Sequence, residues 1–118
     1  MRKIITACMV ALMSSVAAGE DGVLIHNGSV TGQEFMRATE TKQQGYIMGL
    51  VDGFFVAPLM GAPKAKLVPI EKCVEGMSDE QLNAIFLKYL RNNPERWHQS
   101  AHTAFYTAIV ETCGIKMK

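Results

Sequence analysis

The sequence predicts an all-α fold, a small domain of four or five helices closed by one disulfide. Three observations lead to this prediction. Apolar residues recur at helical spacing along several segments of the 118-residue chain, as they do on the buried face of an amphipathic helix. Two of these segments begin with a helix-capping sequence. Two cysteines, Cys73 and Cys113, remain after removal of an amino-terminal leader, and paired cysteines in a small exported domain usually form a disulfide.

The chain begins with a segment that has the layout of a secretory signal peptide. Arg2 and Lys3 precede an apolar stretch, which is followed by small residues up to Gly19. We expect cleavage after Ala18 or Gly19, which divides the chain into a signal peptide at 1–19 and one helical domain at 20–118. A spanning helix needs about 20 continuous apolar residues. Because the apolar stretch is shorter than that, we expect no membrane anchor after cleavage.

The two remaining cysteines favour a structural disulfide over a catalytic thiol. The Cys73–Cys113 bond would close a loop of about 40 residues and stabilise the domain by roughly 4 kcal/mol on the chain-entropy account. That is a large share of the total stability of a small domain. No C-x-x-C motif is present, and a lone nucleophilic thiol would need a reducing compartment.

The first half of the domain predicts one helix that begins at Thr31 and continues to about Val56. Thr31 and Glu34 form a capping box, and the apolar series that starts at Phe35 lacks the alternation of a strand. After this helix, the stretch from Ala57 to Gly76 contains three prolines. We expect it to be a long loop without regular helix, of the kind that is often functional.

Three glycines repeat every four residues within this helix. Gly45, Gly49 and Gly53 lie on one face of it, and each disfavours a helix by up to about 1 kcal/mol relative to alanine. We expect the close approach of a neighbouring helix backbone to offset this cost, so the three residues form a predicted site of close helix packing. The alternative of a contact face between membrane helices is excluded, because Asp52 interrupts an apolar run that is already too short to span a bilayer.

The second half predicts two helices joined by a short turn. Ser78 and Gln81 form a second capping box, followed by a helical stripe of Leu82, Ile85, Phe86, Tyr89 and Leu90. Asn93 and Pro94 stop this helix and start another, whose apolar face is formed by Trp97, Ala101, Ala104, Phe105, Ala108 and Ile109. We expect the two helices to pack as an antiparallel hairpin.

No pattern in the chain predicts an active site or a metal centre. His98 and His102 are four apart on the predicted last helix, but Gln99 occupies the place that glutamate takes in a zinc protease, and no third ligand is identifiable. Serine nucleophile elbows and phosphate-binding glycine loops are absent from the sequence. We therefore expect no cofactor, no metal and no enzymatic activity. The basic residues do not cluster, so nucleic acid is not an expected partner either.

A family resemblance suggests a function. The core GYIMGLVDGFF, then a cysteine, then MSDEQLNAIFLKYLRNNPERWHQSAHTAFYTAIVETC resembles the type VI secretion immunity proteins of the Rap/Tai group. The resemblance covers about Gln33 to Cys113. It implies a small exported helical protein that binds its cognate peptidoglycan amidase effector in the periplasm and inhibits it by blocking the cleft. The alternative is a periplasmic acid-stress chaperone of the HdeA kind, which is also small, helical and closed by one disulfide. An enzyme is the least favoured class.

Two segments are candidates for contact with such an effector. The first segment is Ala57 to Lys72, where the candidate residues are Pro63, Lys64 and Lys66. Proline limits the conformations of the unbound segment, and lysine can steer its association with an acidic cleft of the effector. The second segment is the turn at Asn92–Pro94, with Trp97 and His98 nearby as the candidates. The sequence leaves a homodimer open.

Overall fold

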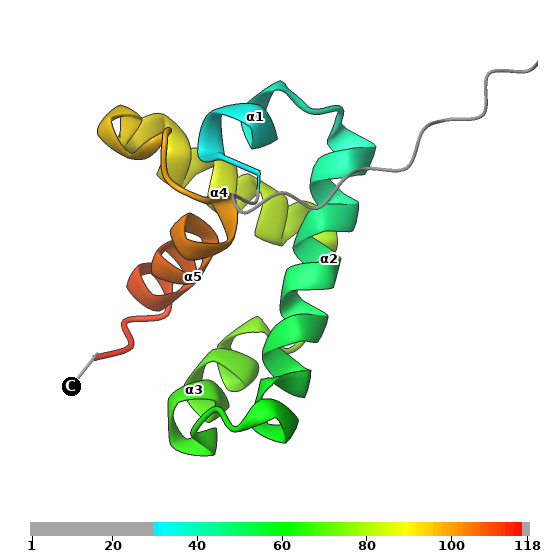
Figure 1. Ribbon diagram of the computed structural model, residues 1–118, viewed down its shortest axis with the longest axis vertical. Coiled ribbons are helices and arrows are strands. Elements are labelled where there is room, and N and C mark those ends of the chain that lie inside the picture. Colours follow the sequence, from blue (N-terminus) through cyan, green and yellow to red (C-terminus); the bar gives the residue numbers. More distant parts are fainter. Residues whose placement is uncertain (1–29, 117–118) are drawn as a thin grey trace, which may run out of the picture.

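The computed structural model describes residues 30–116, and within that range the domain consists of helices. Figure 1 shows their arrangement. The only pairing of the strand type in this range is an isolated antiparallel bridge between Thr31 and Ser100. The all-α prediction is therefore confirmed, whereas the predicted signal peptide lies outside the described residues. In chain order the elements are α1 (Gly32–Arg37), α2 (Glu40–Val56), the 3-10 helix η1 (Ala57–Met60), α3 (Lys64–Val74), α4 (Asp79–Asn92), the 3-10 helix η2 (Pro94–Arg96) and α5 (Ala101–Thr112).

Helix α4 lies at the centre and packs against α1, α2 and α5. Its predicted apolar stripe is buried except for the half-buried Ile85. Phe86 connects two neighbours, because its ring centroid lies 4.7 Å from that of Phe35 in α1 and 5.4 Å from that of Phe105 in α5. Phe54 of α2 stacks on Phe105 at 6.1 Å. One continuous aromatic core thus joins four helices.

The predicted long first helix is in fact two helices. The capping box at Thr31 and Glu34 forms as expected, but α1 ends at Arg37, and Ala38 and Thr39 are extended before α2 starts. The amide of Gln43 in α2 donates to the carbonyl oxygen of Phe35 at 2.9 Å. The same carbonyl also accepts from the Ala38 N–H at 3.1 Å, so Gln43 supplies a second donor where α1 ends. The break therefore lets α1 fold back against the core.

The predicted long loop from Ala57 to Gly76 is wrong. The chain continues as η1 and then α3, which carries Pro69 in its interior. A proline inside a helix removes one backbone hydrogen bond and usually kinks the helix. Leu67, Ile70 and Val74 are buried on one side of α3. The transfer of these apolar side chains out of water offsets the cost of the proline.

The connection between α4 and α5 is also longer than predicted. Asn93 and Pro94 begin only the short η2, and the last helix starts at Ala101 rather than at Pro94. The connection first returns to α1, where Gly32 N–H donates to the Gln99 carbonyl at 2.9 Å. In Figure 1, α4 and α5 run toward the same side of the molecule and diverge, so they do not form the predicted antiparallel hairpin. The five predicted apolar residues from Ala101 to Ile109 are nevertheless buried.

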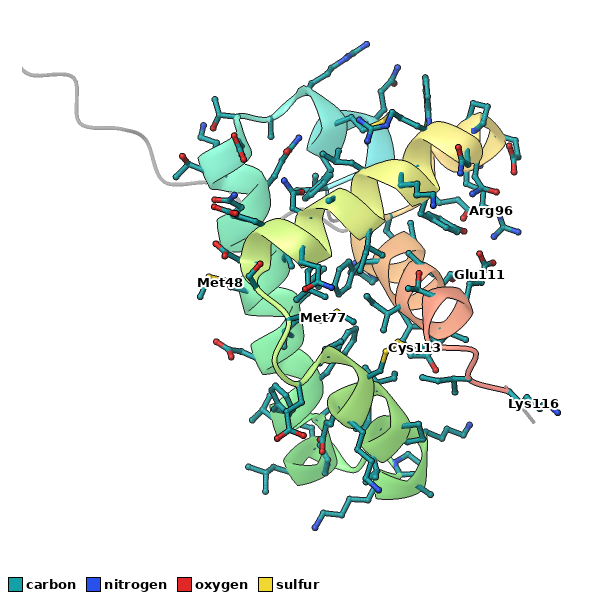
Figure 2. All side chains as sticks on the ribbon, turned by 180° about the vertical axis from the view of Figure 1, so that it is seen from behind. Met48, Met77, Arg96, Glu111, Cys113 and Lys116 are labelled. Carbon is teal, nitrogen blue, oxygen red and sulfur yellow. A yellow bond between two sulfur atoms is a disulfide. The ribbon has the colours of Figure 1, made fainter. Side chains whose placement is uncertain are left out.

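The predicted disulfide is present. Cys73, near the end of α3, is bonded to Cys113, which caps the end of α5, across a sequence separation of 40 residues. It is the covalent link between α3 and the central core. Figure 2 shows Cys113 where α5 approaches α3.

Candidate interaction surfaces

Four exposed large apolar side chains of the described range, including the two most exposed, lie where α2 passes into η1. Phe55, Val56, Leu59 and Met60 are all exposed, and Leu59 and Met60 reach 86% and 83%. We call these four residues the apolar tip. Such side chains normally lie inside a domain, so a group of them on the surface indicates an interaction site.

The local sequence holds the apolar tip in a defined shape. Pro58 lies in the first turn of η1 and fixes its own φ angle. Gly61 ends η1 in the left-handed region at φ 96°, which glycine adopts without steric cost. The N–H of Ala62 then donates to the carbonyl of Ala57 at 3.1 Å. The tip is therefore a hydrogen-bonded turn rather than an open loop.

Three of the predicted partner-binding residues follow the apolar tip directly. Pro63 is the N-cap residue of α3, and Lys64 and Lys66 lie in its first turn. All three are exposed. The structure thus places two cations beside the exposed apolar side chains on the same stretch of chain.

The other two predicted partner-binding residues lie elsewhere and differ from each other. Trp97 is half-buried; its indole N–H donates to the Leu90 carbonyl at 2.6 Å, and its own carbonyl accepts from the Gln33 N–H at 3.0 Å. Trp97 therefore helps to close the end of α4. His98 is exposed in the connection. Figure 1 places this connection and α3 at opposite ends of the molecule, so one small contact patch does not include both.

The predicted close packing at the three α2 glycines is wrong. A Cβ atom built on Gly45, Gly49 or Gly53 would meet no atom within 4 Å, and all three residues are exposed. The glycine that does permit close packing is Gly32, where a Cβ atom would lie 2.8 Å from Leu90 Cδ2. Sequence reasoning missed it because Gly32 belongs to no repeat. The one available signal was its place directly after the Thr31 cap.

Two of the exposed glycines lie in a groove between α2 and α5. This groove, which we call the α2–α5 groove, has a volume of about 470 Å³. Bare backbone at two positions of α2 forms part of its wall, and aromatic and aliphatic side chains form most of the rest. Its lining residues are Gly49, Leu50, Gly53, Phe54, His102, Thr103 and Tyr106.

A second, more polar hollow lies between the ends of α4 and α5. Its volume is about 330 Å³, and its lining includes Lys88, Tyr89 and Glu111. Burial raises the pKa of Tyr89, while the charge of nearby Arg96 acts in the opposite direction. Figure 2 shows Arg96 and Glu111 on the same side of the molecule, and Glu111 lines this hollow. The tyrosine therefore stays protonated and neutral at neutral pH.

The titratable residues singled out by the sequence are not brought together. His98 lies in a turn and His102 in the first turn of α5, so the two do not share the helix face predicted for them. Within residues 30–116, no three potential metal ligands of the His, Cys, Asp or Glu type form a group. No helix in the same range is long and apolar enough to cross a membrane.

These features define a class of protein: a small helical domain, closed by one disulfide, that presents an exposed apolar tip and a shallow groove. The family model of the Rap1a immunity proteins matches residues 6–113. The match covers most of the chain, and the chain therefore belongs to the Rap1a immunity protein family. Comparison with the curated proteins and with the solved structures gave no match.

Proposed function

We propose that the mature protein is a periplasmic immunity protein that binds a type VI secretion peptidoglycan amidase effector and blocks its substrate cleft without chemistry of its own. Membership of the Rap1a immunity family supports a role in neutralising an effector. The Cys73–Cys113 disulfide supports an oxidising compartment, and the leader at 1–19 supports export to it. The observation that carries the mechanism is the exposure of the apolar tip.

The apolar tip has the properties of an anchor for a concave partner. Leu59 and Met60 are almost fully exposed, and burying each of them would contribute about 1.5–3 kcal/mol. Because η1 is already hydrogen-bonded, contains Pro58 and is followed by Pro63, little backbone freedom remains to be lost on binding. A cleft of the partner that accepts this tip is thereby closed to its substrate.

Charge next to the apolar tip would influence the rate of association. Lys64 and Lys66 are exposed in the first turn of α3. Cations at the rim of an interface mainly raise the association rate toward an acidic surface, and they do so less at high salt. We therefore assign anchoring to Leu59 and Met60 and steering to the two lysines.

A double substitution tests this assignment. Leu59→Ser with Met60→Ser removes the two anchors, and we expect the effector to bind about 100-fold more weakly or worse. The melting temperature should hardly change, because both side chains already face solvent. The control is Met48→Ser, an exposed apolar residue of α2 outside the tip. If calorimetric titration gives the double variant wild-type affinity, the tip does not bind the effector.

A homodimer is the competing use of the same surface. An apolar tip that is buried against a second copy would not be free for the effector. Sedimentation of the mature protein alone and with the effector separates the two uses. We expect a monomer whose mass rises on binding; a dimer that the Leu59→Ser, Met60→Ser variant dissociates would assign the tip to self-association instead.

A further inference from the structure

We propose that the apolar tip and the outer face of α3, formed by Lys64, Val68 and Lys72, are together a docking surface for a bilayer that contains anionic phospholipid. This second partner goes beyond the proposed function and does not depend on it, because docking needs only the protein and the lipid. The bilayer and an effector would use the same side chains of the tip, so the two partners exclude each other. Three features support the surface: the shape of the tip, the charges beside it and the hydrogen bonds of its backbone.

The apolar tip protrudes from one end of the molecule. Leu59 and Met60 are 86% and 83% exposed, so their side chains stand clear of the structure around them. Figure 1 shows the turn between α2 and α3 at the opposite end of the molecule from α1. The tip can therefore meet a flat surface before α1 touches it.

Cations accompany the tip along the chain, and carboxylates do not. Between Asp52 and Glu71 the sequence contains two lysines and no acidic residue. Lys64, Val68 and Lys72 follow one another at intervals of four residues, which places them on one face of α3, and all three are exposed. Each lysine close to an anionic lipid surface raises the binding constant about fivefold. The charge beside the tip thus complements anionic headgroups.

The backbone of the tip is suited to the interfacial region of a bilayer. Pro58 and Pro63 have no N–H group that would need a partner. The Gly61 N–H donates to the Pro58 carbonyl at 3.2 Å, and the Ala62 N–H donates to the Ala57 carbonyl at 3.1 Å. An unpaired backbone group is costly in lipid. The closed turn therefore enters this region at lower cost than an open loop.

Stable docking on a bilayer takes apolar contact and charge together. One buried acyl chain gives only marginal, reversible binding, and a neighbouring group of cations makes the binding stable. Segments that lie in the interface bury their apolar side chains about 5–10 Å deep. The apolar tip supplies the buried side chains, and the lysines of α3 follow it directly in the chain. Both contributions thus come from one end of the molecule.

Binding to vesicles tests the docking surface with the mature protein alone. The probe is a vesicle of phosphatidylglycerol and phosphatidylcholine in equal parts, compared with a vesicle of phosphatidylcholine only. We expect the wild-type protein to sediment with the anionic vesicles, and to do so less at high salt, because salt screens the charge of the lysines. Protein that stays in solution with the anionic vesicles at low salt would overturn the proposal, and the proposed effector would be unaffected by that result.

Substitution of the tip measures the apolar contribution. Leu59→Ser with Met60→Ser should weaken binding to the anionic vesicles at least about tenfold. Met48→Ser, which changes an exposed apolar residue outside the tip, should leave binding unchanged. A loss with Met48→Ser as large as that of the double variant would show that another surface binds and would overturn the proposal.

Substitution of a lysine measures the contribution of charge. Lys64→Gln should weaken binding about fivefold at low salt. Lys42→Gln is the matched control, because Lys42 is equally classed as exposed but lies near the start of α2. At 1.5 Å per residue it is about 20 Å along the helix from the tip, which exceeds the screening length of about 10 Å at moderate salt. Equal losses in the two variants would contradict docking through α3.

Fluorescence quenching identifies the inserted end directly. Trp97 is the only tryptophan of the chain, and it lies in the connection that Figure 1 places at the opposite end from α3. Met60→Trp adds a second tryptophan at the tip. With brominated acyl chains in the anionic vesicles, we expect quenching in the Met60→Trp protein and none in the wild type. Quenching in the wild type as well, or in neither protein, would show that the tip is not the inserted end and would overturn the proposal.

Discussion

The side-chain amide of Asn83 donates to Gln43 Oε1 at 3.2 Å inside the core, and Gln43 itself donates to the Phe35 carbonyl at 2.9 Å. Gln43 and Asn83 are both buried. A polar bridge therefore runs from α4 through α2 to the end of α1. It fixes the angle at which α1 folds back, because a buried carbonyl or amide without a partner is costly.

Removing Gln43 should destabilise the domain strongly. Gln43→Ala would leave the Asn83 donor and the Phe35 carbonyl without this partner in the core. We expect the free energy of unfolding to fall by about 2–4 kcal/mol, measured by urea unfolding. Gln44→Ala is the control: it removes only an exposed hydrogen bond to Glu40 and should change the free energy by less than about 0.5 kcal/mol. Equal effects of the two substitutions would contradict a structural role for the bridge.

Alanine should have opposite effects at two glycines. At Gly32 the added Cβ would lie 2.8 Å from Leu90 Cδ2 and 3.4 Å from the Trp97 carbonyl oxygen, so overpacking should cost about 1–3 kcal/mol. At Gly45 it would meet nothing within 4 Å and should gain up to about 1 kcal/mol from helix propensity. The midpoints of urea unfolding of the two variants show whether each substitution stabilises or destabilises the domain. Stabilisation by Gly32→Ala would show that Leu90 moves aside.

Loss of the disulfide should cost a large part of the stability. Replacing both Cys73 and Cys113 by alanine frees α3 from the end of α5 and releases the loop in the unfolded chain. We expect a loss of about 2–4 kcal/mol in the free energy of unfolding. Replacement of both residues, rather than one, avoids leaving a reactive thiol. An unchanged melting temperature in the double variant would mean that packing alone holds α3 in place.

The capping box at the start of α1 predicts a dependence of stability on acid pH. Hydrogen bonds from the Thr31 backbone and hydroxyl lower the pKa of Glu34 below its ordinary value. Because the folded pKa is the lower one, the stabilisation is present above the unfolded value, about 4.3, and is lost as pH falls through the folded pKa. Glu34→Gln should flatten the fall of melting temperature over that window. Parallel curves for wild type and Glu34→Gln would refute the assignment.

Much of the fold could be predicted from local signals in the sequence. The capping box at Thr31 forms as expected. At Ser78 one half of the predicted box forms, in which Ser78 Oγ accepts from the Gln81 N–H at 3.1 Å. The disulfide and the apolar stripe of α4 were also predicted, because capping, cysteine pairing and helical periodicity depend on few neighbours.

The remaining features depend on tertiary contacts, which cannot be predicted from the spacing of residues in the sequence. The break between α1 and α2 depends on Gln43 reaching back to Phe35. Helix α3 tolerates Pro69 because Leu67, Ile70 and Val74 are buried beside it. The exposure of the α2 glycines could not be inferred, because the same repeat suits a packed face and an open one. The apolar tip was missed as a group for a related reason: an apolar residue gives no sign of its own exposure.

Titration of the amidase effector with the mature protein tests the central claim most directly. The measured quantity is the rate of peptidoglycan hydrolysis by the purified effector as the mature protein is added. Our account predicts complete inhibition at one equivalent by the wild-type protein, and loss of that inhibition with Leu59→Ser and Met60→Ser but not with Met48→Ser. Undiminished hydrolysis in a large excess of correctly folded, disulfide-bonded wild-type protein would contradict it.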